Sequence, residues 1–301
     1  MLSVNLEPVF GQVQRNPSLW DPIVVIRHGI CSSYQSFVNL AAHLQEAFPK
    51  AKLDNQSYAW RDSVLISGAR LANHILNTYD PARPLVFIGH SMGGLVCRVA
   101  NVALRDPTSF VYFVTNLSLG LGYAGTDMLE IQNFRLANKP PRKVALLVTL
   151  ATPNSGAVLQ GQVTGIAALL QAGLNAYPPT RSGAVADLTS DRLFRFLQNF
   201  CVDTPSLSIS GSGANRFALG AGQLTAWFSQ RGLRLELPHD LIVEDRSVDL
   251  RSSILPNEIV QQGNARYLHV RTYLNCTDVS HTNIYDDTTV RQTIVDCISR
   301  C

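Results

Sequence analysis

The feature that most constrains the fold of this chain is a buried-strand pattern that turns abruptly into a helix pattern at residues 84–104. The segment reads PLVFIGHSMGGLVCRVANVAL, in which the apolar run LVFI leads into GHSMGG at 89–94. GHSMG matches G-x-S-x-G in the strand–turn–helix context that a nucleophile elbow requires. Because neighbouring side chains would clash in so sharp a turn, glycine is needed two residues before and two after the serine. The segment therefore predicts a strained serine, Ser91, at the amino-terminal end of a helix.

The rest of the chain continues the alternation of strand and helix patterns. Strand patterns occur at 23–29, 52–60, 143–153, 206–211 and 265–274, and helical spacing of apolar residues occurs at 34–48, 64–76 and 286–300. This alternation is typical of βαβ units, so we expect an α/β fold with a mostly parallel central sheet and helices on both faces. With 301 residues, 46% of them apolar, the chain can bury one large core, and we expect a single domain over residues 1–301.

Two stretches after the Ser91 strand interrupt this alternation, at about 107–142 and 154–204, and we interpret them as insertions. The second contains no charged residue between Ser155 and Thr180. A rough helical stripe there has two interpretations, a helix packed on the sheet or a helical cap over an apolar pocket, and amphipathicity alone does not separate them. If the stripe is a cap, its candidate substrate-binding residues are Leu159, Val163, Ile166 and Leu170.

The first predicted strand ends in His28-Gly29-Ile30, a second loop that bears on Ser91. In acyl transfer, negative charge develops on the carbonyl oxygen, and two preorganised N–H groups stabilise it, each by roughly 3 kcal/mol. The main-chain N–H groups of Ile30 and Met92 are the candidates for this oxyanion hole. The Met92 N–H would lie at a helix amino terminus, where unpaired N–H groups favour negative charge. His28 itself has a simpler interpretation, as a residue that only shapes the loop.

A serine nucleophile of this kind needs an acid and then a base further along the chain. Of seven histidines, His281 alone follows the last predicted strand in a loop, TDVSHTN, which suits a base. Asp240, in LELPHDLIVEDRSV, lies between the two preceding strand patterns and is the candidate acid. Other carboxylates remain open as alternatives to it: Glu244, Asp245, Asp249 and Asp203, with Asp278 placed close to His281 in sequence.

Composition and motifs argue against several other classes of protein. The net charge of +3 comes from scattered residues rather than a basic cluster, so we expect no nucleic-acid partner. None of the six cysteines forms a CxxC pair, and we predict no metal site. The G-x-G-x-x-G at 120–125 would need an acidic residue closing the next strand, but that strand ends in LVTLATP. We therefore predict a glycine-rich loop there and no flavin or nicotinamide cofactor.

The amino-terminal segment also bears on where the protein resides. Residues 1–20 lack the basic start and apolar block of a signal peptide. The best candidate for a membrane span, residues 157–174, is interrupted by glutamine, glycine and threonine. We therefore expect a cytoplasmic protein, or a secreted one if an upstream signal has been removed.

Several segments together resemble a known family. VVIRHGICSSYQSFVNLAAHL, SGARLANHI, FIGHSMGGLVCRVA, VTLATPNSGA and HDLIVEDRSV are similar to the serine esterase and lipase group of α/β-hydrolases, which includes relatives of the inositol deacylase of glycolipid-anchored proteins. The resemblance implies the α/β-hydrolase fold, a Ser91–Asp240–His281 triad and an oxyanion hole at Ile30 and Met92. The chain departs from the family at two positions: Asn154 stands where histidine is usual, and Leu241 replaces a glycine beside the acid.

These features predict a carboxylic ester hydrolase, either a lipase or a carboxylesterase, that works through an acyl-enzyme. The expected partner is a small-molecule or lipid ester, and an apolar cap fits transient contact with a membrane surface. A thioesterase, amidase or acyltransferase would use the same scaffold. A hydrolase-like binding protein without turnover is the alternative from another class. The sequence carries no signal for an oligomeric state.

Overall fold

The computed structural model spans the chain and describes Asn16 and residues 19–30, 32–117, 123–154, 158–159, 162–163, 183–189, 193, 197, 204–211, 271–276, 279–281 and 283–301. Within these residues, six strands form one sheet in the order β2-β1-β3-β4-β7-β8, and every neighbouring pair is parallel. Their bounds are β1 Ile23–Arg27, β2 Lys52–Asn55, β3 Leu85–His90, β4 Leu146–Leu150, β7 Ser206–Gly211 and β8 Arg271–Cys276. The predicted mostly parallel sheet is therefore confirmed.

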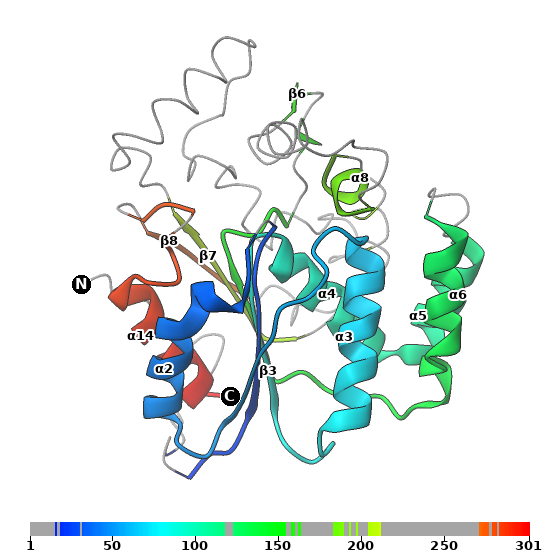
Figure 1. The fold of residues 1–301 in the computed structure, drawn as a ribbon. Helices are drawn as coiled ribbons and strands as arrows, with labels where there is room; N and C mark the ends of the chain where they lie inside the picture. The colour runs from blue at the N-terminus through cyan, green and yellow to red at the C-terminus, as the bar shows by residue number, and fades with distance from the viewer. Residues whose placement is uncertain are drawn as a thin grey trace, which may run out of the picture.

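Helices cover both faces of this sheet, as Figure 1 shows. One face carries α3 (Val64–Thr78) and α4 (Met92–Arg105), and the other carries η1 (Tyr34–Phe37), α2 (Val38–Ala47) and α14 (Thr288–Ser299). The side chains of β1 and β3 alternate between two buried clusters, so Val25 and Phe87 pack towards α3 and α4 while Val24 and Val86 pack towards α2 and α14. Strands buried on both faces explain the continuous apolar runs in the sequence.

Residues 107–142 add an outer layer beside α3 and α4. They form α5 (Pro107–Leu117), α6 (Gly125–Asn133) and the short η2 (Leu136–Asn138). The apolar run before the G-x-G-x-x-G motif is thus helix α5, whereas a dinucleotide site needs a strand there.

The second insertion differs from its sequence pattern. Val158–Leu159 (β5) and Gln162–Val163 (β6) pair as a small antiparallel hairpin, with Val158 opposite Val163. The helix predicted from the apolar stripe is therefore wrong at Leu159 and Val163, which lie in strands. Only Gln160 and Gly161 separate the two strands, and a two-residue connection containing glycine is typical of a hairpin. Ile166, Leu170 and the side chains of the hairpin lie outside the described residues.

A described helix of the same insertion, α8 (Gly183–Thr189), is attached to the start of α3. The buried carboxylate of Asp187 accepts a hydrogen bond from the Val64 N–H at 2.7 Å. Val64 opens α3, and a carboxylate there satisfies a main-chain donor that has no partner within the helix. The insertion is thus tied to the helix layer at the carboxyl end of the sheet (Figure 1).

Candidate active site

Ser91 lies in a sharp turn between the central strand β3 and helix α4, as the G-x-S-x-G motif predicted. Its backbone has φ 52° and ψ −127°, a conformation that is strained for any residue other than glycine. The turn is held in place because the Ser91 N–H donates to the Leu150 carbonyl at the end of β4, 2.8 Å away. Met92 is the first residue of α4, so its N–H has no acceptor within the helix.

The flanking glycines are required by close backbone contacts. A Cβ placed on Gly89 would lie 2.4 Å from the Gly94 Cα, and one on Gly93 would lie 2.3 Å from the Arg27 carbonyl oxygen. Both distances are far below any contact that a carbon atom tolerates, and both involve backbone atoms that cannot simply rotate away. The elbow, the start of α4 and the end of β1 are therefore packed into one rigid unit.

The loop after β1 lies directly beside Ser91. A Cβ on Gly29 would be 2.9 Å from the Ser91 Cβ, which places the main chain of this loop against the serine. The His28 side chain fixes this loop through two hydrogen bonds. Its Nδ1–H donates to the Gly29 carbonyl at 2.8 Å, and its Nε2 accepts from the Tyr58 N–H at 3.3 Å. Burial lowers the pKa of His28, and its two partners require the neutral ring.

Tyr58 also explains why β2 is shorter than predicted. Its ring stacks on His28 with centroids 4.5 Å apart, and its hydroxyl donates to the His28 carbonyl at 2.9 Å. The Tyr58 N–H donates to the His28 imidazole in the loop after β1 and not to a main-chain carbonyl of β1. The strand therefore ends at Asn55 and not at Trp60.

A buried ion pair supports the same loop. Arg27 ends β1, and its guanidinium donates to Asp54 on β2 at 3.1 Å and to the main-chain carbonyl of Asp54 at 2.9 Å. Tyr79 donates to the same carboxylate at 2.9 Å, and His74 lies 3.2 Å from it. Burial alone would raise the pKa of Asp54, but the charge and hydrogen bonds of Arg27 hold it below its usual value.

His281 is brought to the elbow from the far end of the chain. It lies, almost fully buried, between β8 and α14. Its carbonyl oxygen is 2.8 Å from Nε2 of His90, the residue before Ser91, and the centroids of the two imidazole rings are 4.7 Å apart. Asn283 closes the loop, because its Oδ1 accepts from the Ser280 N–H at 2.7 Å and from the Ser280 hydroxyl at 2.8 Å.

The structure therefore gathers Ser91, Met92, Ile30 and His281 around one turn at the carboxyl end of the sheet. The candidate acid Asp240 lies outside the described residues, as do its alternatives Glu244, Asp245, Asp249, Asp203 and Asp278.

Sequence reasoning missed the parts played by His90, Tyr58 and Asn283. His90 lies within the G-x-S-x-G motif, but its partner His281 is 191 residues away in the sequence, so no local pattern could reveal that contact.

Asn154, the position at which the chain departs from the family pattern, is fully buried beside the elbow. Its side-chain amide donates to Thr149 Oγ1 at 3.2 Å, and its main-chain carbonyl accepts from the guanidinium of Arg98 on α4 at 2.8 Å. These contacts tie the segment after β4 to the helix that follows Ser91.

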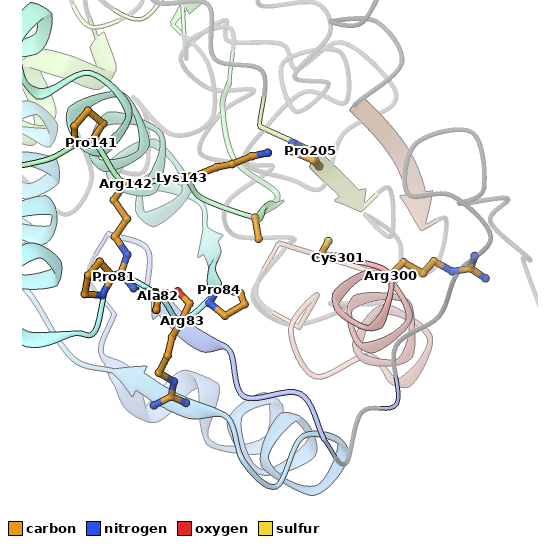
Figure 2. Close-up of a pocket in the computed structure, with 11 residues that line it drawn as sticks. Pro81, Ala82, Arg83, Pro84, Pro141, Arg142, Lys143, Pro205, Arg300 and Cys301 are labelled. Carbon is orange, nitrogen blue, oxygen red and sulfur yellow. Dashed lines mark hydrogen bonds between the residues drawn. The ribbon is translucent and has the colours of Figure 1, made fainter.

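A cavity of about 490 Å³ lies at the opposite edge of the sheet, where the strands begin (Figure 2). Four of its lining residues are cationic, yet Figure 2 shows the side chains of Arg83 and Arg300 pointing away from each other. Arg142 donates to the main-chain carbonyls of Tyr79, Asp80 and Arg83 at 3.2, 2.8 and 3.2 Å. Arg83 likewise donates to the carbonyls of Asp21 and Lys50. These arginines hold turns together through main-chain carbonyls, and their guanidinium groups do not point to one place where an anion could bind.

The residues that the structure describes hold neither a candidate metal site nor a candidate membrane span. Within them, no three His, Cys, Asp or Glu side chains are grouped so as to hold a metal ion. None of the helices described above is both long and apolar enough to cross a membrane.

Comparison with protein families gives one match, to the family described as "Putative serine esterase (DUF676)", over residues 20–171. The chain belongs to this family. The part that matches the serine esterase family contains the loop after β1, the elbow and the segment after β4, whereas His281 lies beyond it. No curated protein sequence matches the chain.

Solved structures that resemble this serine esterase family member include lipases and esterases. The mature form of the lipase BlEst2 from Bacillus licheniformis is 15% identical, with a TM-score of 0.57 over 95% of this chain and 96% of that one. EstA from Clostridium botulinum is 14% identical, with a TM-score of 0.57 over 96% and 88%. At these identities the likeness concerns the fold, and it confirms the α/β-hydrolase fold that the sequence predicted.

Proposed function

We propose that this chain hydrolyses carboxylic esters through an acyl-enzyme on Ser91, with His281 as base and Asp240 as acid. The observation that carries the proposal is the strained turn at Ser91, packed against the Gly29 loop on one side and joined through His90 to the His281 loop on the other. Strain of this kind persists only where the surroundings enforce it, and it is concentrated at functional sites. The serine esterase family supports the same chemistry.

The reaction follows from these positions. His281 takes the proton of the Ser91 hydroxyl while the oxygen attacks the ester carbonyl carbon, and a tetrahedral oxyanion forms. When this intermediate collapses, the bond to the alcohol oxygen breaks and the imidazolium of His281 returns its proton to the alcohol. Water then attacks the acyl-enzyme by the same route and releases the acid. Asp240 would orient the imidazole and stabilise its charged form.

The N–H groups of Met92 and Ile30 are the proposed oxyanion hole. The Met92 N–H opens helix α4, where the helix dipole favours a developing negative charge. The Ile30 N–H has no main-chain acceptor among the residues that the structure describes, and it follows the glycine that lies against Ser91. Two donors in a buried site cost no reorganisation when the oxyanion forms.

The acyl group would lie beneath the uncharged insertion at 155–180, in a single domain whose cap is formed by part of residues 154–204. Leu159, Val163, Ile166 and Leu170 are the side chains that we propose contact it. The attachment of α8 to α3 through Asp187 supports a cap fixed at the carboxyl end of the sheet. An apolar cover of this kind favours acyl chains of some length, and the substrate is a small-molecule or lipid ester.

Hydrolysis of p-nitrophenyl esters from C2 to C16 tests this function, with wild type compared against folded Ser91→Ala. We expect wild type to turn over and the variant to be inactive, and the chain-length optimum separates a lipase from a short-chain esterase. If wild type cleaves thioesters or amides but no oxygen ester, the scaffold serves the neighbouring chemistry. Failure to hydrolyse any substrate would support a binding protein instead.

A further inference from the structure

His90 lies beside Ser91 but takes no part in the proposed chemistry. It ends β3, directly before the nucleophile, and only 6% of its surface is exposed. Its ring packs edge-on against Tyr285, with centroids 5.1 Å apart, and against Phe37 at 6.1 Å. An aromatic cage of this kind fixes the plane of the imidazole and therefore the direction of its Nε2–H.

The proton on His90 can be assigned from its partner. Nε2 lies 2.8 Å from the carbonyl oxygen of His281, and a carbonyl only accepts, so Nε2 carries the hydrogen. Burial, together with the neighbouring His281, holds the pKa of His90 well below its usual value. The ring is therefore a neutral, permanently oriented donor, and a poor candidate for a second general base.

The contact acts on the main chain of the base itself. Asn283 accepts from the Ser280 N–H, a contact that spans His281, and Asp287 accepts from the Val290 N–H at the start of α14. His90 reaches the loop from the opposite direction, through the residue adjacent to the nucleophile. Because His90 and Ser91 are consecutive, any shift of the elbow is passed directly to the backbone of His281.

We propose that His90 is a positioning residue, whose Nε2–H fixes the main chain of His281 so that its imidazole meets the Ser91 hydroxyl. This inference rests on the proposed function for its effect on rate, since it assigns His281 as the base. It adds a role for the variable second residue of G-x-S-x-G: in this chain, that residue joins the nucleophile to the base loop.

Three substitutions separate positioning from packing. His90→Gln keeps an N–H donor at nearly the position of Nε2 but loses the aromatic ring. His90→Phe keeps the ring between Phe37 and Tyr285 but loses the donor. His90→Asn loses the ring and is too short for its amide to reach the His281 carbonyl. His43→Gln, on helix α2 away from the site, is the control for a general effect of replacing histidine.

Positioning and packing predict opposite orders of activity. If His90 positions the base, kcat for a p-nitrophenyl ester falls about 10- to 100-fold in His90→Phe and His90→Asn, and only a few-fold in His90→Gln. KM should change little in all three, because His90 is buried and acts through the main chain of His281. If His90 only fills space, His90→Phe is the most active of the three, and that order would overturn the proposal.

Hydrogen–deuterium exchange of residues 279–287 provides a readout that does not depend on turnover. We expect faster exchange in His90→Phe and His90→Asn than in wild type, and wild-type exchange in His90→Gln and His43→Gln. Equal exchange in all variants would contradict the proposed hold on the loop. If wild type hydrolyses no ester, the proposed function fails, and the exchange data still decide whether His90 fixes the His281 loop.

Discussion

The two edges of the central sheet use buried polar side chains in contrasting ways. At the beginning of the strands, Arg142 and Arg83 donate hydrogen bonds to main-chain carbonyls and hold turns together. At the carboxyl end, His28 and His90 also bind carbonyls, but these belong to the two loops that flank Ser91. Similar hydrogen bonds therefore hold turns at one edge and hold the two loops beside Ser91 at the other. Substitutions at the first edge should change stability alone, and those at the second should change rate.

The largest difference is expected between His281→Ala and Arg142→Met. Removing the proposed base, His281, should lower kcat roughly 10⁴-fold or more, because the Ser91 hydroxyl then lacks its proposed proton acceptor. Arg142→Met should leave kcat and KM for a p-nitrophenyl ester unchanged. Steady-state kinetics on variants with native circular dichroism provide the measurement. A loss of rate in Arg142→Met that matched that of His281→Ala would remove the contrast between the edges.

Gly93→Ala tests the rigidity of the carboxyl edge. Its new Cβ would lie 2.3 Å from the Arg27 carbonyl oxygen, so the backbone must move, and we expect a loss of about 3 kcal/mol in the free energy of unfolding together with a fall in activity. Gly125→Ala is the matched control, since a Cβ there meets nothing within 4 Å. Urea denaturation of both variants measures the difference, and equal stabilities would contradict this packing.

The ion pair between Arg27 and Asp54, next to the His28 loop, should contribute to the free energy of unfolding in a way that depends on pH. Asp54→Asn leaves the buried Arg27 charge without its partner and should cost about 3 kcal/mol of unfolding free energy at pH 7. Because the folded pKa of Asp54 lies below its unfolded value, this stabilisation is present above a pH of about 4 and is lost as the pH falls through the folded pKa. Urea denaturation from pH 7 to pH 3 should show the difference between wild type and variant begin to shrink below a pH of about 4. A constant difference would mean that Asp54 does not titrate as proposed.

The smallest expected effect is on stability at the beginning of the strands. Arg142→Met removes the guanidinium from three main-chain carbonyls, of which that of Asp80 keeps the Arg83 N–H, and we expect a loss of about 2 kcal/mol in the free energy of unfolding. The midpoint of urea denaturation, read at unchanged slope, reports this value. Wild-type stability in the variant would show that water replaces the guanidinium at no cost.

The sequence could predict what depends on neighbours along the chain. The elbow at Ser91, the parallel sheet and the flanking helices follow from local patterns, since glycine spacing and apolar runs record backbone strain and burial. The hairpin at 158–163 was missed, because a short apolar stretch fits a helix or a strand equally well. The His90–His281 contact and the pairing of Arg27 with Asp54 were beyond reach, because only the assembled sheet brings those residues together.

Mapping a fluorophosphonate adduct by mass spectrometry tests the central claim most directly. The probe forms a covalent bond only with a serine whose hydroxyl is activated, and the modified residue is read from the digested peptide. We expect one adduct, on Ser91, which disappears in Ser91→Ala and forms much more slowly in His281→Ala. An unlabelled wild-type protein, or an adduct on any other residue, would contradict the claim that Ser91 is the nucleophile.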